Sequence, residues 1–110
     1  MRFTLRQIQV FVEIARSENV SRAAEALSLS QSAASAALAE LESQFDQQLF
    51  DRNGKRLRLN DQGGLLLPHA VELLDRAAEI EALLRGERGL GSLRVGATLT
   101  IGNYLLPLIV

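Results

Sequence analysis

Hydrophobic residues recur every three or four positions through the first part of the chain, which is the spacing of one face of an α-helix. This pattern predicts a helix over residues 4 to about 17, with Thr4 and Gln7 at the spacing of a capping box. A second, shorter helix is expected over residues 22–27, with Ser21 as its N-cap. The start of the chain is therefore expected to be helical.

A third helix is expected to begin after Ser30, a good N-cap, and to end near Phe45. Its apolar face consists of Ala34, Ala37, Leu38, Leu41 and Phe45. The opposite face starts with small or uncharged side chains, at Gln31, Ser32, Ser35, Ala36 and Ala39. Helix faces that meet only solvent usually carry charged residues, so this face is a candidate surface for a partner.

A change from helical to alternating periodicity predicts a hairpin over residues 49–59. Asn53-Gly54 separates two short segments and is a typical hairpin turn sequence. Arginine and leucine alternate over residues 56–59, so one side of this strand can pack while the other is cationic. We expect a small cationic wing after the third helix.

A long helix is expected from Asn60 or Asp61, either of which can cap it, to about Arg85. Its apolar residues include a heptad seam at Leu66, Ala70, Leu73, Ala77, Ile80 and Leu84. A second apolar stripe lies beside the seam, at Leu67, Val71, Leu74 and Ala78. Two stripes need partners on two sides, so one is expected to pack within the chain and the other to form a homodimer. We assign the dimer to the seam, although the seam could instead pack on the first helix of its own chain.

The last part of the chain is interpreted as the start of another domain. Glycines over residues 87–91 indicate a hinge, residues 93–97 alternate like a short strand, and Thr100 can cap a final apolar helix. The chain stops inside an apolar run, which we interpret as a cut just inside a second domain. The expected division is residues 1–60, a long helix over 61–86, a hinge over 87–91 and a truncated domain over 92–110.

Composition narrows the possible chemistry. The 110 residues include no cysteine and one histidine, His69, which excludes disulfides, thiol catalysis and a multi-histidine metal site. No nucleophile–base set and no Gly-rich phosphate loop is present, so we expect neither an enzyme nor a bound cofactor. Apolar runs are far shorter than the ~20 residues that cross a bilayer. We expect a cytoplasmic protein with no membrane contact.

The formal net charge of −1 hides an uneven distribution. Residues 52–58 carry four cations (Arg52, Lys55, Arg56, Arg58) and no acid, whereas residues 60–90 carry six acids against three cations. A nucleic-acid-binding domain usually has a basic surplus, which the total lacks. The uneven distribution of charge nevertheless gives the predicted wing a local positive charge.

Two short helices joined by a tight turn, the second with a small polar outer face, are typical of a helix-turn-helix. The first turns of the second helix would enter a DNA major groove, where Gln31 can pair with adenine and Ser32 and Ser35 can bond base edges. The wing cations would lie along the backbone or reach the minor groove.

Two alternatives stay open at this point. The polar and cationic residues could be solvated surface on a helical dimerisation module that does not bind DNA. Arg22 could pair with Glu18 or Glu25 instead of a phosphate.

Several blocks of the sequence resemble the LysR-type transcriptional regulators over residues 2 to about 90. These blocks are Leu5-Arg6-Gln7-Ile8-Gln9-Val10-Phe11, Ser21-Arg22-Ala23-Ala24-Glu25-Ala26-Leu27, Ser30-Gln31-Ser32-Ala33-Ala34-Ser35, Leu41-Glu42, Leu49-Phe50-Asp51-Arg52 and Leu59-Asn60-Asp61-Gln62-Gly63. The resemblance implies a mainly α fold: a winged helix-turn-helix, a long dimerising linker helix, and the first strand and helix of an α/β effector domain. It also implies a homodimer, a tetramer in the full-length protein, an inverted-repeat promoter site in double-stranded DNA and a small-molecule effector.

The resemblance also implies roles for particular residues. The expected DNA-binding residues are Ser21, Arg22, Ser30, Gln31, Ser32, Ser35, Arg52, Lys55 and Arg56. Thr98 and Thr100 fall where the family places hydroxyls that hold the effector, although they could be only a strand end and a helix cap. A helix start at Thr100 would favour an anionic effector. Many members carry proline in place of Ser32 and a cation in place of Ala36, so one expected DNA contact is missing here.

Overall fold

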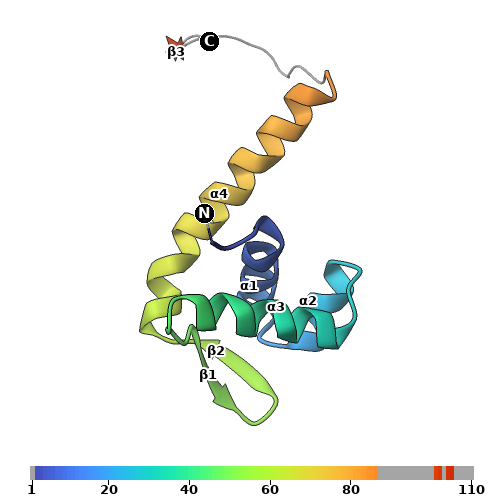
Figure 1. Ribbon diagram of the computed structural model, residues 1–110, viewed down its shortest axis with the longest axis vertical. Helices are drawn as coiled ribbons and strands as arrows, with labels where there is room; N and C mark the ends of the chain where they lie inside the picture. The colour runs from blue at the N-terminus through green and yellow to red at the C-terminus, as the bar shows by residue number, and fades with distance from the viewer. Residues whose placement is uncertain (1, 87–100, 103, 106–110) are drawn as a thin grey trace. The chain divides into compact units, whose positions relative to one another are not determined.

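The computed structural model describes residues 2–86, 101–102 and 104–105. Its elements are α1 Leu5–Ser17, α2 Val20–Ala26, α3 Gln31–Gln44, β1 Phe50–Asn53, β2 Arg56–Leu59, α4 Asp61–Leu84, β3 Ile101–Gly102 and β4 Tyr104–Leu105. Figure 1 shows α1, α2 and α3 grouped together, with the β1–β2 hairpin following α3. The predicted order of three helices, a hairpin and a long helix is confirmed.

Helix α1 begins with the predicted capping box. The hydroxyl of Thr4 accepts a hydrogen bond of 3.1 Å from the backbone N–H of Gln7, whose side-chain oxygen accepts one of 3.0 Å from the N–H of Thr4. The helix ends at Glu18, which adopts a left-handed φ of 58° and donates its N–H to the carbonyl of Ile14. The local sequence thus fixes both ends of α1.

The N-cap of α2 is Asn19, and the expectation of Ser21 was wrong. The side-chain oxygen of Asn19 accepts a hydrogen bond of 3.0 Å from the backbone N–H of Arg22. Asparagine caps a helix about as well as serine, and Asn19 already has extended backbone angles directly after α1. The helix therefore starts at Val20, and two residues separate α1 from α2.

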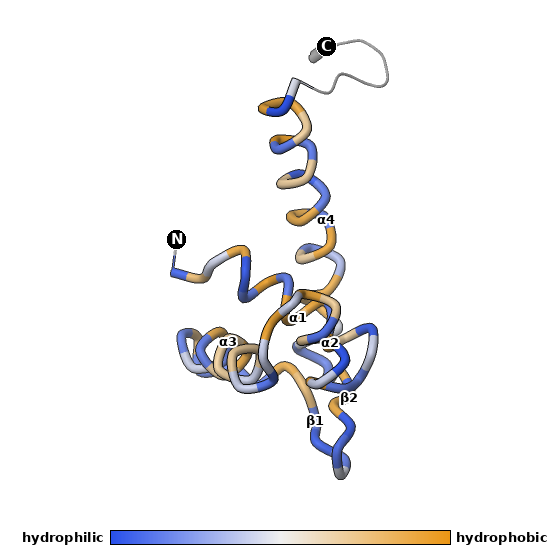
Figure 2. Tube along the Cα trace, turned by 90° about the vertical axis from the view of Figure 1, so that its right-hand side faces the viewer, coloured by the Kyte–Doolittle hydropathy of each residue, from blue (hydrophilic) through white to orange (hydrophobic). Residues whose placement is uncertain are grey.

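The first three helices and the hairpin share one apolar core. Its largest fully buried side chains all come from α1 and are Val10, Phe11, Val12 and Ile14. Small buried residues, Ala23 and Ala24 in α2 and Ala34 in α3, allow the helices to approach closely. The ring of Phe11 lies 5.5 Å, centroid to centroid, from the ring of Phe50 and so ties β1 to this core. Figure 2 shows the alternation of apolar and polar positions along the helices and the polar far end of the hairpin.

The hairpin turn lies one residue later than predicted. Asn53 pairs with Arg56 at the end of the ladder, so the loop residues are Gly54 and Lys55 instead of Asn53-Gly54. Gly54 has a φ of +66°, whereas Lys55 is not among the residues of positive φ, as expected for a type II′ turn with glycine first. Glycine supplies the positive φ without steric cost, which leaves Asn53 in the strand.

Helix α4 starts against the hairpin. Of the two expected caps the structure selects Asn60, whose side-chain oxygen accepts a hydrogen bond of 2.8 Å from the N–H of Gly63. A Cβ on Gly63 would lie 2.2 Å from the carbonyl oxygen of Leu49 and 2.7 Å from a methyl carbon of Leu59. The close approach of α4 to the strands therefore requires glycine at this position.

The chain divides into two units, residues 1–74 and 75–110, and the division falls inside α4. In the second unit, β3 and β4 pair antiparallel, with Ile101 opposite Leu105 and Gly102 opposite Tyr104. The helix predicted over residues 101–110 is therefore wrong at these four positions. Isoleucine and tyrosine favour strands, and glycine disfavours a helix interior. The hinge, the strand predicted over 93–97, Thr98 and Thr100 lie outside the described residues.

Candidate nucleic-acid interface

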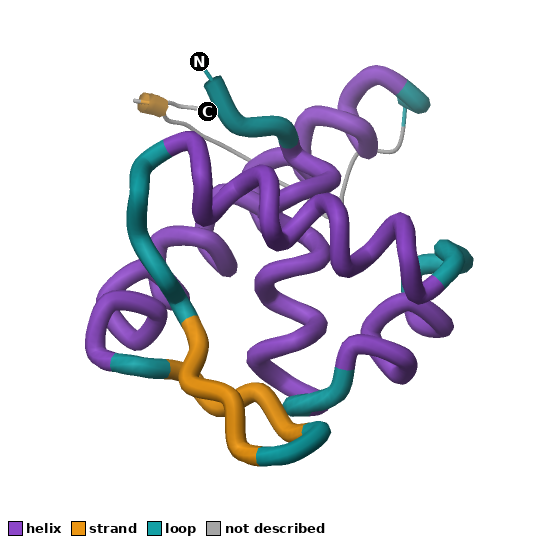
Figure 3. Tube along the Cα trace, turned by 60° about the horizontal axis from the view of Figure 1, so that its bottom comes forward, coloured by secondary structure: helices purple, strands orange, loops and turns teal. Residues whose placement is uncertain are grey.

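An open groove of about 390 Å³ brings together the start of α2, the exposed face of α3 and the hairpin. Five of the nine predicted DNA-binding residues line it, and they are Ser21, Gln31, Ser35, Arg52 and Lys55. Asn19, Val20, Gly54 and Leu57 complete the lining. Figure 3 shows the two strands and their turn at one side of the helices. Segments far apart in the sequence thus form one polar and cationic surface.

Side chains of α2 and of the N-cap residue Ser30 form hydrogen bonds with the first turn of α3. The hydroxyl of Ser21 donates a bond of 2.9 Å to the side-chain oxygen of Gln31, which links α2 to α3. The hydroxyl of Ser30 accepts a bond of 3.1 Å from the N–H of Ala33, as the predicted N-cap, and lies 3.2 Å from the hydroxyl of Ser32. Ser30 therefore caps the helix, while Gln31 lines the groove and accepts the hydrogen bond from Ser21.

The wing has two faces that differ in charge. Side chains alternate along a strand, so Arg52 shares a face with Leu57, which lies opposite it in the ladder and is buried. Arg56 and Arg58 lie on the other face, where Asp51 is directly opposite Arg58. Of the four wing cations, Arg52 and Lys55 line the groove, and Arg56 and Arg58 do not.

Both arginines of the outer face pair with Glu18, at the end of α1. Arg56 contacts one carboxylate oxygen of Glu18, and Nε of Arg58 lies 3.9 Å from the other. The backbone N–H of Leu57, between the two arginines, donates a hydrogen bond of 3.1 Å to the carbonyl of Glu18. The structure thus places Arg56 in an intramolecular ion pair and outside the groove, whereas we predicted that it contacts DNA.

The remaining predicted residues, Arg22, Ser30 and Ser32, are exposed but do not line the groove. Within the described part of the chain, no carboxylate lies within ion-pair distance of Arg22. The alternative, an ion pair of Arg22 with Glu18 or Glu25, is therefore wrong, and Glu18 pairs instead with Arg56 and Arg58. Sequence reasoning missed Asn19 as a groove residue, although its residue type and its place before Val20 were a signal for an N-cap.

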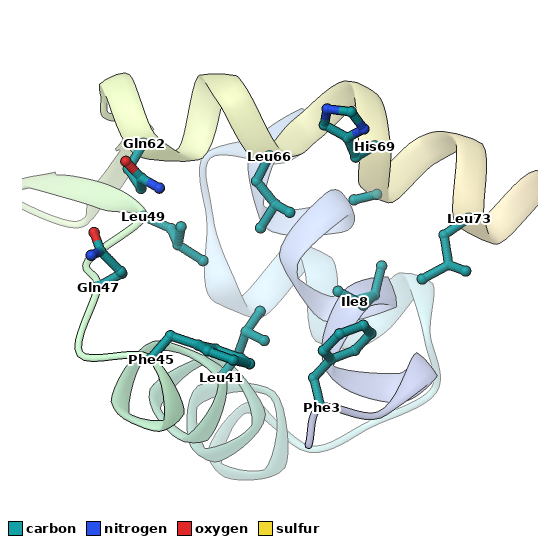
Figure 4. Close-up of a pocket in the computed structure, with 11 residues that line it drawn as sticks. Phe3, Ile8, Leu41, Phe45, Gln47, Leu49, Gln62, Leu66, His69 and Leu73 are labelled. Atoms are coloured by element: carbon teal, nitrogen blue, oxygen red, sulfur yellow. The ribbon is translucent and has the colours of Figure 1, made fainter. Parts of the chain in front are cut away.

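The heptad seam divides between the inside and the outside of the chain. Leu66, Ala70 and Leu73 line an apolar cavity of about 320 Å³ with residues of α1 and α3, as Figure 4 shows. Ala70 is 2% exposed, so it packs inside its own chain and presents no surface to a partner. Ile80 and Leu84, in contrast, are 57% and 83% exposed. The predicted seam is thus partly a core element and partly an open apolar surface.

Among the described residues, no group of three or more His, Asp or Glu side chains is arranged to hold a metal ion. No helix within the same residues is long and apolar enough to span a membrane. His69 is exposed beside the apolar cavity, as a plain helix residue would be.

The sequence is similar to a known protein family and to curated proteins. Residues 5–64 match the model of the bacterial regulatory helix-turn-helix proteins of the lysR family. Over 110 residues the chain is 51% identical to YeiE of Escherichia coli strain K12, described as an uncharacterized HTH-type transcriptional regulator, and the match covers all of this chain and 37% of YeiE.

Solved structures show the same likeness. The oxidized form of Corynebacterium glutamicum OxyR is similar at 36% identity with a TM-score of 0.74, over 78% of this chain and 26% of OxyR. A crystal structure of a CbnR_DBD-DNA complex is similar at 25% identity with a TM-score of 0.69, over 76% of this chain and 97% of that chain. The chain itself spans 37% of the length of YeiE. Because the family model covers more than half of the sequence, the chain belongs to the LysR family of bacterial regulatory helix-turn-helix proteins.

Proposed function

We propose that this chain is the sequence-specific DNA-binding part of a transcription regulator, not an enzyme. The observation that carries the proposal is the groove in which the uncharged polar face of α3 meets two cations of the wing. Similarity to the CbnR_DBD-DNA complex supports it. A polar helix face free of carboxylates can approach base edges, and adjacent cations can neutralise phosphates.

In this proposal the first turns of α3 enter the major groove. Gln31 makes a bidentate contact with adenine, and Ser35 and Ser32 bond neighbouring base edges. Arg52 and Lys55 contact the backbone or the minor groove. Ser21, Arg22 and Ser30 lie at the same end of the helix-turn-helix, where hydroxyl and guanidinium groups can bond phosphate oxygens.

The proposal is tested by selecting bound sequences from a random duplex pool and measuring their affinity by fluorescence anisotropy. A DNA-binding domain is expected to enrich one motif and to bind random duplex weakly but measurably at low salt. The competing interpretation, a helical dimerisation module, predicts no binding at low salt. Failure to enrich any motif would refute sequence-specific recognition.

We further propose that the chain forms a homodimer through α4. Ile80 and Leu84 support this, because they are exposed apolar residues four positions apart on one helix. Exposed apolar stripes of this kind usually mark an interface. A two-fold dimer would present two α3 helices to two half-sites, so the expected target is an inverted repeat. The selected motif should therefore be palindromic.

For the whole protein we propose a cytoplasmic tetramer that responds to a small-molecule effector held by Thr98 and Thr100. The support is the resemblance of residues 93–97 and 100–107 to the start of the family's effector domain. Replacing Thr100 with alanine in the longer protein should weaken effector binding, measured by calorimetry, without altering DNA affinity in the absence of effector. Unchanged effector affinity would remove Thr100 from the site.

A further inference from the structure

The outer face of the wing carries balanced charges. Arg56 and Arg58 lie there with Asp51 across the ladder and with Glu18 beside β2. Two cations thus face two carboxylates. The groove face, in contrast, has Arg52, with Lys55 in the adjoining turn. The positive charge of the wing is therefore concentrated toward the groove.

The carboxylate of Glu18 is held next to β2 by the backbone, independently of the ion pairs. Its N–H donates to the carbonyl of Ile14 at 2.7 Å, and its own carbonyl accepts from the N–H of Leu57 at 3.1 Å. These two bonds fix the residue between the end of α1 and the edge of β2. The wing therefore keeps its anchor even when the side chain of residue 18 loses its charge.

The ion pairs themselves add little to the stability of the fold. The side chains of Arg56 and Arg58 are 66% and 61% exposed, and ion pairs this open to water are screened and weak. Their main effect is on the electrostatic potential of the wing. A cation that already has a carboxylate partner releases fewer counterions when a phosphate approaches.

We propose that Glu18 is a positioning residue that limits non-specific DNA binding. It holds the guanidinium groups of Arg56 and Arg58 on the outer face and neutralises their charge, so that phosphates are attracted to Arg52 and Lys55 in the groove. This inference rests on the proposed function. It assigns a role in recognition to a residue that need not touch DNA.

The test is the salt dependence of binding by Glu18→Gln, which keeps the shape of the side chain and removes its charge. The probes are a labelled random-sequence duplex and the motif selected by the wild-type chain. Released from Glu18, one or both arginines can meet phosphates, so the plot of log affinity against log salt should become steeper by about one to two units. Affinity for random duplex should rise several-fold and affinity for the selected motif less, so that their ratio falls.

Glu25→Gln is the matched control. Glu25 is an exposed residue of α2, and within the described residues no ion pair involves it. The same change of net charge at Glu25 should leave the salt slope close to that of the wild type. Adding Arg56→Ala and Arg58→Ala to Glu18→Gln should restore the wild-type slope. Thermal unfolding should show similar midpoints for all these variants.

Three results would overturn the inference. The slope of Glu18→Gln could equal that of the wild type, both glutamate variants could shift it equally, or Glu18→Gln could lose affinity for every sequence alike. The third result would mean that the carboxylate supports the wing mechanically. If the wild-type chain binds no duplex at low salt, the proposed function itself fails, and this outcome is distinct from binding with an unchanged slope.

Discussion

The hydroxyl of Ser21 donates a hydrogen bond of 2.9 Å to the side-chain oxygen of Gln31, and this bond joins the first turn of α2 to the first turn of α3. The two residues also line the same groove. The amide of Gln31 is therefore oriented before any DNA arrives, which lowers the entropy cost of a base contact.

Replacing Gln31 with alanine should reduce affinity for the selected motif by about 1–3 kcal/mol and relax the preference at one base pair. Affinity for random duplex should change much less, because the amide carries no charge. Competition binding against single-base variants of the motif measures both effects. Equal weakening on every sequence would show that Gln31 does not read a base.

Arg52→Ala should weaken binding to all sequences and make the salt slope shallower by about one unit, because one phosphate or minor-groove cation is lost. Arg56→Ala is the matched control, since Arg56 belongs to the same hairpin but pairs with Glu18 outside the groove. Its salt slope should stay near that of the wild type. A larger change for Arg56 than for Arg52 would reverse the assignment of the two wing faces.

Gly63→Ala should destabilise the fold by about 1–3 kcal/mol, because the added carbon would lie 2.2 Å from the carbonyl oxygen of Leu49. Gly64→Ala, one position along the same helix, meets open space. It should raise stability by roughly 0.5–1 kcal/mol, as alanine favours a helix interior. Urea denaturation measures both, and a neutral Gly63→Ala would mean that α4 can move off the strand at no cost.

Ile80→Glu should convert the proposed dimer to a monomer with little change in thermal stability, because Ile80 is exposed in the isolated chain and a dimer would bring two new charges together. Leu73 is less suitable for this test, since it lines the cavity inside its own chain. Leu65→Glu is the control, because Leu65 is 69% exposed on α4 but outside the heptad seam. Sedimentation velocity distinguishes the two states, and an intact dimer of Ile80→Glu would disprove the assigned seam.

Local sequence signals predicted most of the helical part of the fold. Two helix caps are visible in the sequence, because each satisfies a free N–H group three residues further along the chain. The hydroxyl of Thr4 accepts from the N–H of Gln7, and the hydroxyl of Ser30 accepts from the N–H of Ala33. The N-cap of α2 was harder to predict from the sequence. Asn19 and Ser21 are both good caps, and a helix of seven residues has too little periodicity to select between them.

The contacts of the wing cations could not be predicted in this way. Arg56 and Glu18 are 38 residues apart, and nothing in their local sequences indicates the contact. The spacing of Ala70 likewise fits a heptad seam, but only the packing of α4 on α1 shows that this residue is buried within the chain. The sequence predicted which residue types would form the interface. The hairpin register decides which of the wing cations line the groove.

The contacts of Glu18 have a practical consequence for chimeric regulators. The backbone of this residue joins α1 to β2, and its side chain meets two arginines of the hairpin. A hairpin grafted from a relative would therefore lie beside the carboxylate of Glu18, which in this chain pairs with Arg56 and Arg58. Exchange of recognition specificity between members of the family should succeed more often when residue 18 is transplanted together with residues 50–59.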